Sequence, residues 1–174
     1  MLEIEVKARL RDTEALKNKL KEMGAKFVKS STQEDVYFEH PSRDFASSDE
    51  ALRLRKQERR ITLTYKGPRI DRITKTREEH KVEVSDETEA REILERIGFR
   101  GVYEVKKQRD YYELGDFKVM LDKVEGLGDY IEVEKHKGDY DPQEIINFLK
   151  GLGVSEKDME RRSYLELLLK KSQT

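Results

Sequence analysis

Hydrophobic and charged residues alternate along many short segments of the chain. At the N-terminus, Glu3, Glu5 and Lys7 alternate with Ile4 and Val6. Successive side chains of a β-strand point to opposite faces, so a strand here would carry the three charges on one face. The same alternation, with many Val, Ile, Tyr or Thr residues, predicts eight strands. Their ranges are 2–9, 35–40, 51–57, 60–66, 73–85, 102–114, 117–124 and 129–136.

Four segments between or after these strands have apolar residues at helical spacing. The predicted helices are 13–23, 88–97, 142–152 and 162–171. An aspartate that can cap the helix start precedes each of the first three, and a glycine follows each of them. These residues are Asp12, Asp86 and Asp141, and Gly24, Gly98 and Gly153. The similar helix endings at 20–24, 94–98 and 149–153 reflect either convergence of amphipathic strand–helix units or two related halves of the chain.

The order of these elements predicts an α+β fold. No linker rich in Pro, Gly or Ser divides the chain, so residues 1–174 are expected to form one domain. Short connections at 58–59 and 115–116 favour hairpins, and eight such strands predict an antiparallel β-barrel or tunnel. Helices would pack on the outside and charged side chains would line the interior. The apolar residues expected to face outward against the helices are Ile4, Val6, Leu52, Leu54, Val82, Val84, Ile131 and Val133.

Composition excludes several classes of protein. Charged residues make up 42% of the chain, but 36 basic and 37 acidic residues give a net charge of -1. This balance argues against a protein held to nucleic acid or a membrane by bulk charge. The absence of cysteine excludes disulfides and thiolate zinc sites, and the scattered His40, His80 and His136 do not predict a histidine metal site. No apolar run is long enough to span a membrane and no signal peptide is evident, so a cytoplasmic location is expected.

The charges on the alternating strands are segregated by sign. Charge on one face of a strand usually means a solvated face. Here, however, some strands are basic and others acidic, and like charges two residues apart repel unless they are compensated. The basic positions are Arg53, Arg55, Lys66, Lys107 and Arg109, and the acidic ones are Glu3, Glu5, Glu132 and Glu134. Arg and Lys bind phosphate oxygens, whereas carboxylates bind Mg²⁺ or Mn²⁺, so the pattern predicts a metal–phosphate site.

Several of these motifs, in this order, resemble the CYTH superfamily, the triphosphate tunnel metalloenzymes. Glu3-x-Glu5-x-Lys7 matches the ExExK signature of that family. The resemblance covers nearly the whole chain and is greatest to the CyaB-type class IV adenylate cyclases, especially at 51–55, 64–68 and 124–128. The other matching segments are Asp35-x-Tyr37-Phe38, Leu63-Thr-Tyr-Lys-Gly-Pro68, Lys107-x-Arg109, Leu121-Asp122 and Gly126-Leu-Gly128 followed by Glu132-x-Glu134.

The resemblance implies roles for individual residues. Divalent metal, Mg²⁺ or Mn²⁺, would be held by Glu3, Glu5, Glu132 and Glu134, with Asp122 near them. The triphosphate would be bound by Lys7, Arg53, Arg55, Lys66, Lys107 and Arg109. For Arg53 and Lys107, structural salt pairing is the alternative. Further tunnel-lining candidates, which share one face of a predicted strand, are Lys75, Arg77, Glu79, Lys81 and Glu83.

Three functional hypotheses follow from this pattern. In an adenylate cyclase, the ribose 3′-oxygen of ATP attacks the α-phosphorus and pyrophosphate leaves; in a triphosphatase, water attacks the terminal phosphorus of thiamine triphosphate or inorganic triphosphate. Both reactions use the same metal- and phosphate-binding residues, so the motifs do not distinguish between them. A non-catalytic binder of nucleotides or polyphosphate would not require all four glutamates, and their retention favours catalysis. No general base and no purine pocket can be assigned, and the apolar stretch 164–169 either docks on the barrel or pairs with another subunit in a homodimer.

Overall fold

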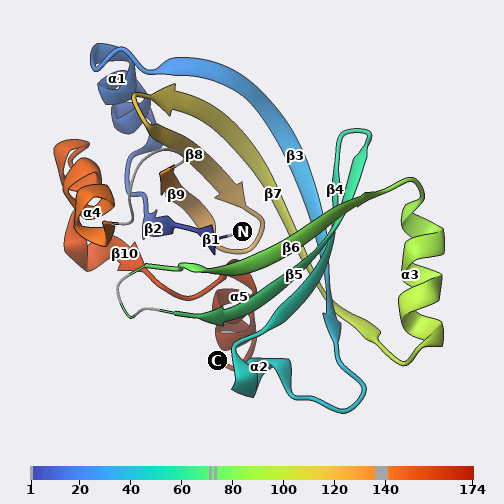
Figure 1. The fold of residues 1–174 in the computed structure, drawn as a ribbon. Coiled ribbons are helices and arrows are strands. Elements are labelled where there is room, and N and C mark those ends of the chain that lie inside the picture. The colour runs from blue at the N-terminus through green and yellow to red at the C-terminus, as the bar shows by residue number, and fades with distance from the viewer. Residues whose placement is uncertain (1, 71, 73, 136–140) are drawn as a thin grey trace.

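The computed structural model describes residues 2–70, 72, 74–135 and 141–174, without the side chains of Leu2 and Glu3. Its centre is one antiparallel sheet with the strand order β1-β6-β5-β4-β3-β7-β8-β9-β2-β10 (Figure 1). The strands are β1 (Leu2–Glu3), β2 (Glu5–Arg9), β3 (Lys26–Glu39), β4 (Ala51–Gln57), β5 (Arg60–Arg69), β6 (Arg77–Val84), β7 (Arg100–Leu114), β8 (Phe117–Val124), β9 (Gly128–Lys135) and β10 (Met159–Glu160). The helices are α1 (Thr13–Glu22), α2 (Phe45–Ser48), α3 (Glu87–Arg96), α4 (Pro142–Gly151), α5 (Tyr164–Ser172) and the 3₁₀ helix η1 (Glu156–Asp158).

The N-terminal segment connects the two ends of the curved sheet. β1 pairs with β6 and β2 pairs with β9, although β1 and β2 are separated only by Ile4. The backbone N–H of Lys75, just before β6, also donates to the Glu5 carbonyl over 3.0 Å. Within the described residues no continuous ladder closes the sheet. The N-terminal ExExK segment therefore lies where the two ends of the sheet meet.

The expected α+β fold and its antiparallel strands are confirmed, with differences in extent. The strand expected at 35–40 is the end of the long β3, which begins at Lys26 and pairs with β7 over most of its length. β6 begins at Arg77, and residues 73 and 136 of two expected strands lie outside the described residues. The short elements α2, η1 and β10 were not predicted because each is too short to show a periodic pattern.

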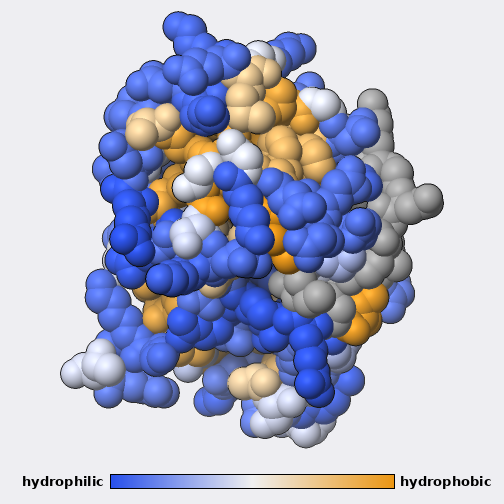
Figure 2. Space-filling model, turned by 90° about the vertical axis from the view of Figure 1, so that its left-hand side faces the viewer, coloured by the Kyte–Doolittle hydropathy of each residue, from blue (hydrophilic) through white to orange (hydrophobic). Residues whose placement is uncertain are grey.

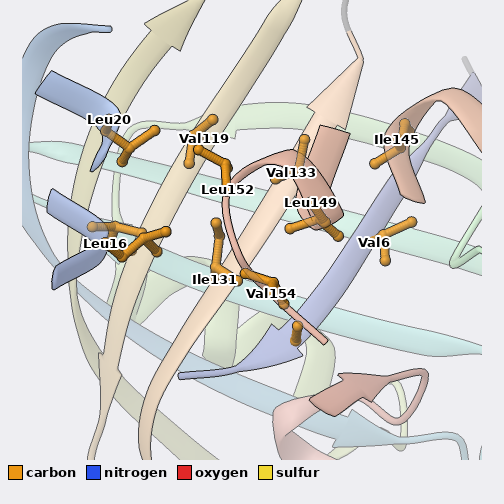
Figure 3. Packing of buried hydrophobic residues seen from close by; sticks show 12 residues of the cluster. Val6, Leu16, Leu20, Val119, Ile131, Val133, Ile145, Leu149, Leu152 and Val154 are labelled. Carbon is orange, nitrogen blue, oxygen red and sulfur yellow. The ribbon is translucent and has the colours of Figure 1, made fainter. Parts of the chain in front are cut away.

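The main hydrophobic core lies between the sheet and helices α1 and α4. Figure 3 shows Leu16 and Leu20 of α1 and Leu149 of α4 beside Val119 and Ile131 of the sheet. These side chains are all buried because the apolar stripes of both helices face the apolar side of the strands. The opposite sides of the helices are polar, and hydrophilic residues cover most of this face of the molecule (Figure 2).

A second hydrophobic core lies under α3. It contains several of the residues that were expected to face outward. Leu52 and Leu54 of β4 pack with Leu94 of α3, as the alternation predicts. Val82 is an exception, because its side chain is 56% exposed. The expectation that a helix covers Val82 is wrong, since α3 packs mainly against β4 and β7 and does not extend over this part of β6.

Helix α5 differs from the expectation that the helices pack on the outside of the sheet. α1, α3 and α4 lie at the periphery of the sheet, whereas α5 lies within its bend (Figure 1). Tyr164 packs on Val105, Val124 and Tyr130, and Val124 is the cross-strand partner of the interior residue Lys107. α5 therefore covers an apolar part of the inner face. Within the described residues, no helix is long and apolar enough to cross a membrane.

Candidate functional site

The bend of the sheet encloses a cavity of about 670 Å³. Its wall combines basic side chains of β4, β5 and β7 with Glu5 of β2 and Glu132 of β9. Residues directly opposite each other in an antiparallel ladder project to the same face, so the register sets this arrangement. Lys66 is opposite Glu79, for example, and both line the cavity.

Arg55 is fixed by a carboxylate of the neighbouring strand. Its Nε and Nη2 atoms donate to the two carboxylate oxygens of Asp35 over 2.6 and 2.7 Å, a bidentate pair. Burial alone would raise the pKa of Asp35, but the Arg55 guanidinium outweighs this effect and holds the pKa well below its usual value. Asp35 therefore stays ionised and keeps Arg55 in place.

Arg53 carries a buried hydrogen-bond donor that no described residue accepts from. Its side chain lies opposite Tyr37 in the ladder and the residue is only 7% exposed. Among the described residues, its Nε has no hydrogen-bond partner. Burial alone would lower the pKa of Arg53, but Asp35 and Tyr37 keep it above the usual value. A buried, unsatisfied donor on a permanent cation suits an incoming anion.

Asp122 and Glu132 share Arg109. The Arg109 guanidinium donates to both oxygens of Asp122, over 2.6 and 2.5 Å, and also contacts Glu132. Burial alone would raise the pKa of Glu132, yet Arg109 and Lys107 hold it well below its usual value. Both acids are thus charged inside the protein. Only Glu132 reaches the cavity, because Asp122 lies behind Arg109.

Two lysines of the interior differ in their access to the cavity. Lys107 lines the cavity, and burial together with Arg109 lowers its pKa to about 8. Lys7 is fully buried and its ammonium group donates to the backbone carbonyl of Arg162 instead. Burial lowers the pKa of Lys7 well below its usual value.

The structure brings most of the predicted site residues together. Those that line the cavity are Glu5, Glu132, Arg53, Arg55, Lys66, Lys107 and Arg109, with Lys75, Arg77, Glu79 and Lys81 of the more loosely predicted set. Those that do not line it are Lys7, Asp122, Glu134 and Glu83. Glu134 faces Lys118 at 3.8 Å, and Glu83 is paired with the exposed Arg60. The side chain of Glu3 lies outside the described residues.

Sequence reasoning assigned no role to three residues that shape the site. Asp35 and Tyr37 belong to a segment that resembles the family, and their shared parity with Arg53 and Arg55 becomes visible only once the β3–β4 register is known. Tyr164 starts α5 and lines the cavity. Its helical position gives no sign that it faces the charged interior.

The acidic side of the cavity fits a divalent metal bound together with phosphate. Among the described residues, no group of three or more Asp, Glu or His side chains converges on one point. Glu5 and Glu132 do converge on one cation, because the Lys75 ammonium lies 2.6 Å from Glu5 and 3.8 Å from Glu132. Mg²⁺ typically takes one or two carboxylates and completes its shell with water and substrate phosphates. These two glutamates match that requirement.

Comparison with known proteins gives matches over most of the chain. The CYTH domain matches residues 1–164. The "Putative adenylate cyclase MJ0240" of Methanocaldococcus jannaschii is 41% identical over an alignment of 172 residues that covers 96% of this chain and 98% of that protein. "Adenylate cyclase CyaB" of Aeromonas hydrophila is 32% identical over an alignment of 174 residues that covers 95% of this chain and 87% of that protein.

A solved structure agrees with these matches. The PH1819 protein of Pyrococcus horikoshii OT3 superimposes with a TM-score of 0.89 at 39% identity, covering 97% of this chain and 99% of that one. The family match, the two relatives and this structure all span most of the sequence. The chain therefore belongs to the CYTH domain family.

Proposed function

We propose that this protein is a metal-dependent adenylate cyclase of the class IV, CyaB-like type, which converts ATP into cyclic AMP and pyrophosphate. The observation that carries the proposal is the cavity in which cations of three strands face Glu5 and Glu132. Within it, the Arg53 Nε has no hydrogen-bond partner among the described residues and is suited to donate to a phosphate oxygen. The names of the two relatives support the choice of reaction.

The cations of the cavity would bind the triphosphate. Arg53, Arg55, Lys66, Lys107 and Arg109 all line it and can donate to phosphate oxygens. Glu5 and Glu132 would hold Mg²⁺ or Mn²⁺, which when bound stabilises negative charge on the phosphates. Because α5 adds Tyr164 to this cavity, residues 1–174 would act as one domain.

The cations of the cavity would stabilise the negative charge that develops during the reaction. As the ribose 3′-oxygen attacks the α-phosphorus, the bond to the β-phosphate oxygen breaks and negative charge develops on the departing pyrophosphate. Arginines held in place by carboxylates stabilise such charge without having to reorganise. The Asp35–Arg55 and Asp122–Arg109 pairs provide this rigidity.

Another part of the cavity wall favours a substrate with an organic group. Phe45 and Tyr103 line the cavity in addition to the cations. Its volume of about 670 Å³ lies within the range of about 300–1,000 Å³ typical of small-molecule pockets. Inorganic triphosphate alone would leave these apolar faces without a contact. ATP would place its adenine ring against them.

A triphosphatase acting on thiamine triphosphate is the second candidate. The aromatic faces of Phe45 and Tyr103 can stack with the rings of thiamine as well as with adenine, and the phosphate clamp serves both reactions. A non-catalytic nucleotide or polyphosphate-binding protein would use the same cations. The two reactions differ in their products, and a binding protein would form none.

The decisive experiment incubates the protein with ATP, thiamine triphosphate or inorganic triphosphate in the presence of Mg²⁺ or Mn²⁺ and identifies the products by chromatography. Cyclic AMP with pyrophosphate supports the cyclase. Orthophosphate without cyclic AMP contradicts it and supports the triphosphatase, whereas binding without turnover supports the binder. Arg53→Ala should abolish most of the activity. Arg60→Ala is the matched control, since Arg60 is exposed and paired with Glu83.

Removal of metal tests the role of the two glutamates. We expect a chelator to stop turnover and added Mg²⁺ or Mn²⁺ to restore it. Glu5→Gln and Glu132→Gln should raise the metal concentration needed for half-maximal activity, because an amide is a weaker ligand than a carboxylate. Undiminished turnover in the chelator would contradict the metal requirement.

A further inference from the structure

Tyr164 contacts three of the charged groups in the interior. Its hydroxyl donates to Oδ2 of Asp122 over 2.8 Å. Its ring centroid lies 4.1 Å from the Lys7 ammonium and 4.7 Å from the Lys107 ammonium. The residue is 6% exposed and borders the cavity. A single side chain of the C-terminal helix therefore touches Asp122 and two lysines.

Asp122 Oδ2 is shared by several donors. It accepts from the Arg109 guanidinium over 2.5 Å and from the Tyr164 hydroxyl, while the Lys107 ammonium lies 3.3 Å away. That last distance is longer than an ordinary charged hydrogen bond. Without the tyrosine hydroxyl, Lys107 could move onto this oxygen. It would then form a tighter pair with Asp122 and turn away from the cavity.

The Tyr164 ring also limits where the two lysines can lie. Lys7 and Lys107 carry like charges, and the ammonium groups of both contact the Tyr164 ring. The electrons of the ring attract both cations electrostatically. Lys7 donates to the Arg162 carbonyl, two residues before α5, while Lys107 faces the cavity. The ring thus occupies the space into which Lys107 would otherwise fold back.

We propose that Tyr164 is a positioning residue that keeps Lys107 directed at the bound triphosphate, by occupying Asp122 Oδ2 with its hydroxyl and by packing its ring beside the ammonium group. This role rests on the proposed function, since it requires a triphosphate ligand. The C-terminal helix α5 is then a part of the binding site. A purely structural role, in which Tyr164 only docks α5 on Val105, Val124 and Tyr130, makes different predictions.

The test is a double-mutant cycle with Tyr164→Phe and Lys107→Ala. Affinities for ATP and for inorganic triphosphate are measured by calorimetry with Mg²⁺ present, and kcat and KM are measured with ATP. We expect Tyr164→Phe to weaken triphosphate binding by about 3- to 10-fold, the equivalent of one hydrogen bond. The loss should appear in KM and not in kcat. In the Lys107→Ala background the same substitution should change affinity by less than about twofold, because the residue through which it acts is gone.

Tyr164→Leu removes the ring as well as the hydroxyl and should weaken binding more than Tyr164→Phe. Because Tyr164→Phe keeps the ring, it should retain part of the affinity that Tyr164→Leu loses. Circular dichroism at the assay temperature checks that each variant is folded. Equal losses with Phe and Leu, or a full Tyr164→Phe effect in the Lys107→Ala background, would overturn the positioning role.

Two controls separate positioning from helix docking. Tyr130→Phe removes a hydroxyl from the neighbouring ring, whose centroid lies 5.2 Å from that of Tyr164, and should leave affinity unchanged. Leu168→Ala loosens α5 at a residue that packs with the same cluster. A loss of affinity in Leu168→Ala equal to that in Tyr164→Phe would assign the effect to docking alone.

The outcomes also separate this inference from the proposed function. If the wild type binds triphosphate without producing cyclic AMP, the cyclase proposal fails and the binding cycle still decides the role of Tyr164. If cyclic AMP forms but Tyr164→Phe binds triphosphate normally, the positioning role alone fails. If the wild type binds no triphosphate at all, both fail.

Discussion

At the scale of single residues, the interior keeps many charges ionised away from bulk water. Each carboxylate there faces a cation: Asp35 faces Arg55, and Asp122 and Glu132 share Arg109. Burying an ion is costly unless a partner compensates it, so these pairs are required wherever charges line a cavity. Lys107 is less well compensated, because Arg109 lies beside it as well as Asp122.

The pH dependence of substrate affinity should follow the protonation state of Lys107. An ammonium group binds phosphate, whereas a neutral amine does so only weakly, and the pKa of Lys107 is lowered to about 8 by burial. Its charge is therefore present below that pH and lost above it, so KM for ATP should rise as the pH increases through 8. The measurement is KM on both sides of this pKa. In Lys107→Arg the guanidinium stays charged, and persistence of the rise there would assign it to another group.

Asp35 should make stability depend on acid pH. Its folded-state pKa is held below the ordinary value, so its contribution is complete above pH of about 4 and is lost as the pH falls towards the folded-state pKa. Asp35→Asn should lower the free energy of unfolding at neutral pH by about 3–5 kcal/mol, because Arg55 loses its buried partner. Its stability should also fall less on acidification. Urea unfolding measures both effects, with the exposed Asp116→Asn as a control that should change neither.

At the scale of elements, the two faces of each strand have separate tasks. The outward residues of β2, β8 and β9 form the core with α1 and α4, while the inward residues of β2 and β9 supply Glu5 and Glu132 to the cavity. Because side chains alternate, one strand serves both stability and the site. Changes on the outer face should therefore leave the site intact as long as the protein folds.

Leu149→Ala tests this separation. Leu149 is fully buried between α4 and the sheet, and truncation of such a leucine typically lowers the free energy of unfolding by about 2–5 kcal/mol. We expect that loss in urea unfolding, with an unchanged KM for ATP in the folded protein. Asn147→Ala, on the exposed side of the same helix, should have little effect on either quantity. A large change in KM with Leu149→Ala would show that the two faces are coupled.

At the scale of the whole molecule, the curved sheet gathers charged side chains from several strands around one cavity. Basic residues from β4, β5 and β7 converge on one cavity, and the Arg53 Nε within it has no partner among the described residues. A polyanion bound there would supply an acceptor for this donor. It should therefore stabilise the folded state.

Thermal unfolding with and without ligand measures this stabilisation. At a ligand concentration of 100 times Kd, binding adds about 2.7 kcal/mol, which corresponds to a rise in Tm of about 5–10 °C for a protein of this size. We expect this rise with Mg²⁺ and ATP. Arg53→Ala should lose most of the rise and Arg60→Ala should keep it. An equal rise in both variants would place the ligand outside the cavity.

The alternation of charge with Val, Ile and Tyr determined much of this protein. Strand identity depends on local spacing alone, so β2, β4, β5, β8 and β9 were predictable, and so were the inward positions of Glu5, Arg53, Arg109 and Glu132. The caps of α1, α3 and α4 are likewise local, and the glycines that follow them have positive φ.

Only the tertiary structure decided how these side chains pair. Asp35 meets Arg55 through the β3–β4 register, and Asp122 lies behind Arg109 instead of at the cavity surface. The position of α5 inside the bend, with Tyr164 against Lys7, Lys107 and Asp122, joins segments far apart in the chain. Periodicity fixes which face of a strand or helix a residue occupies. Its partners depend on strand order, register and helix docking, which arise only when the whole sheet has formed.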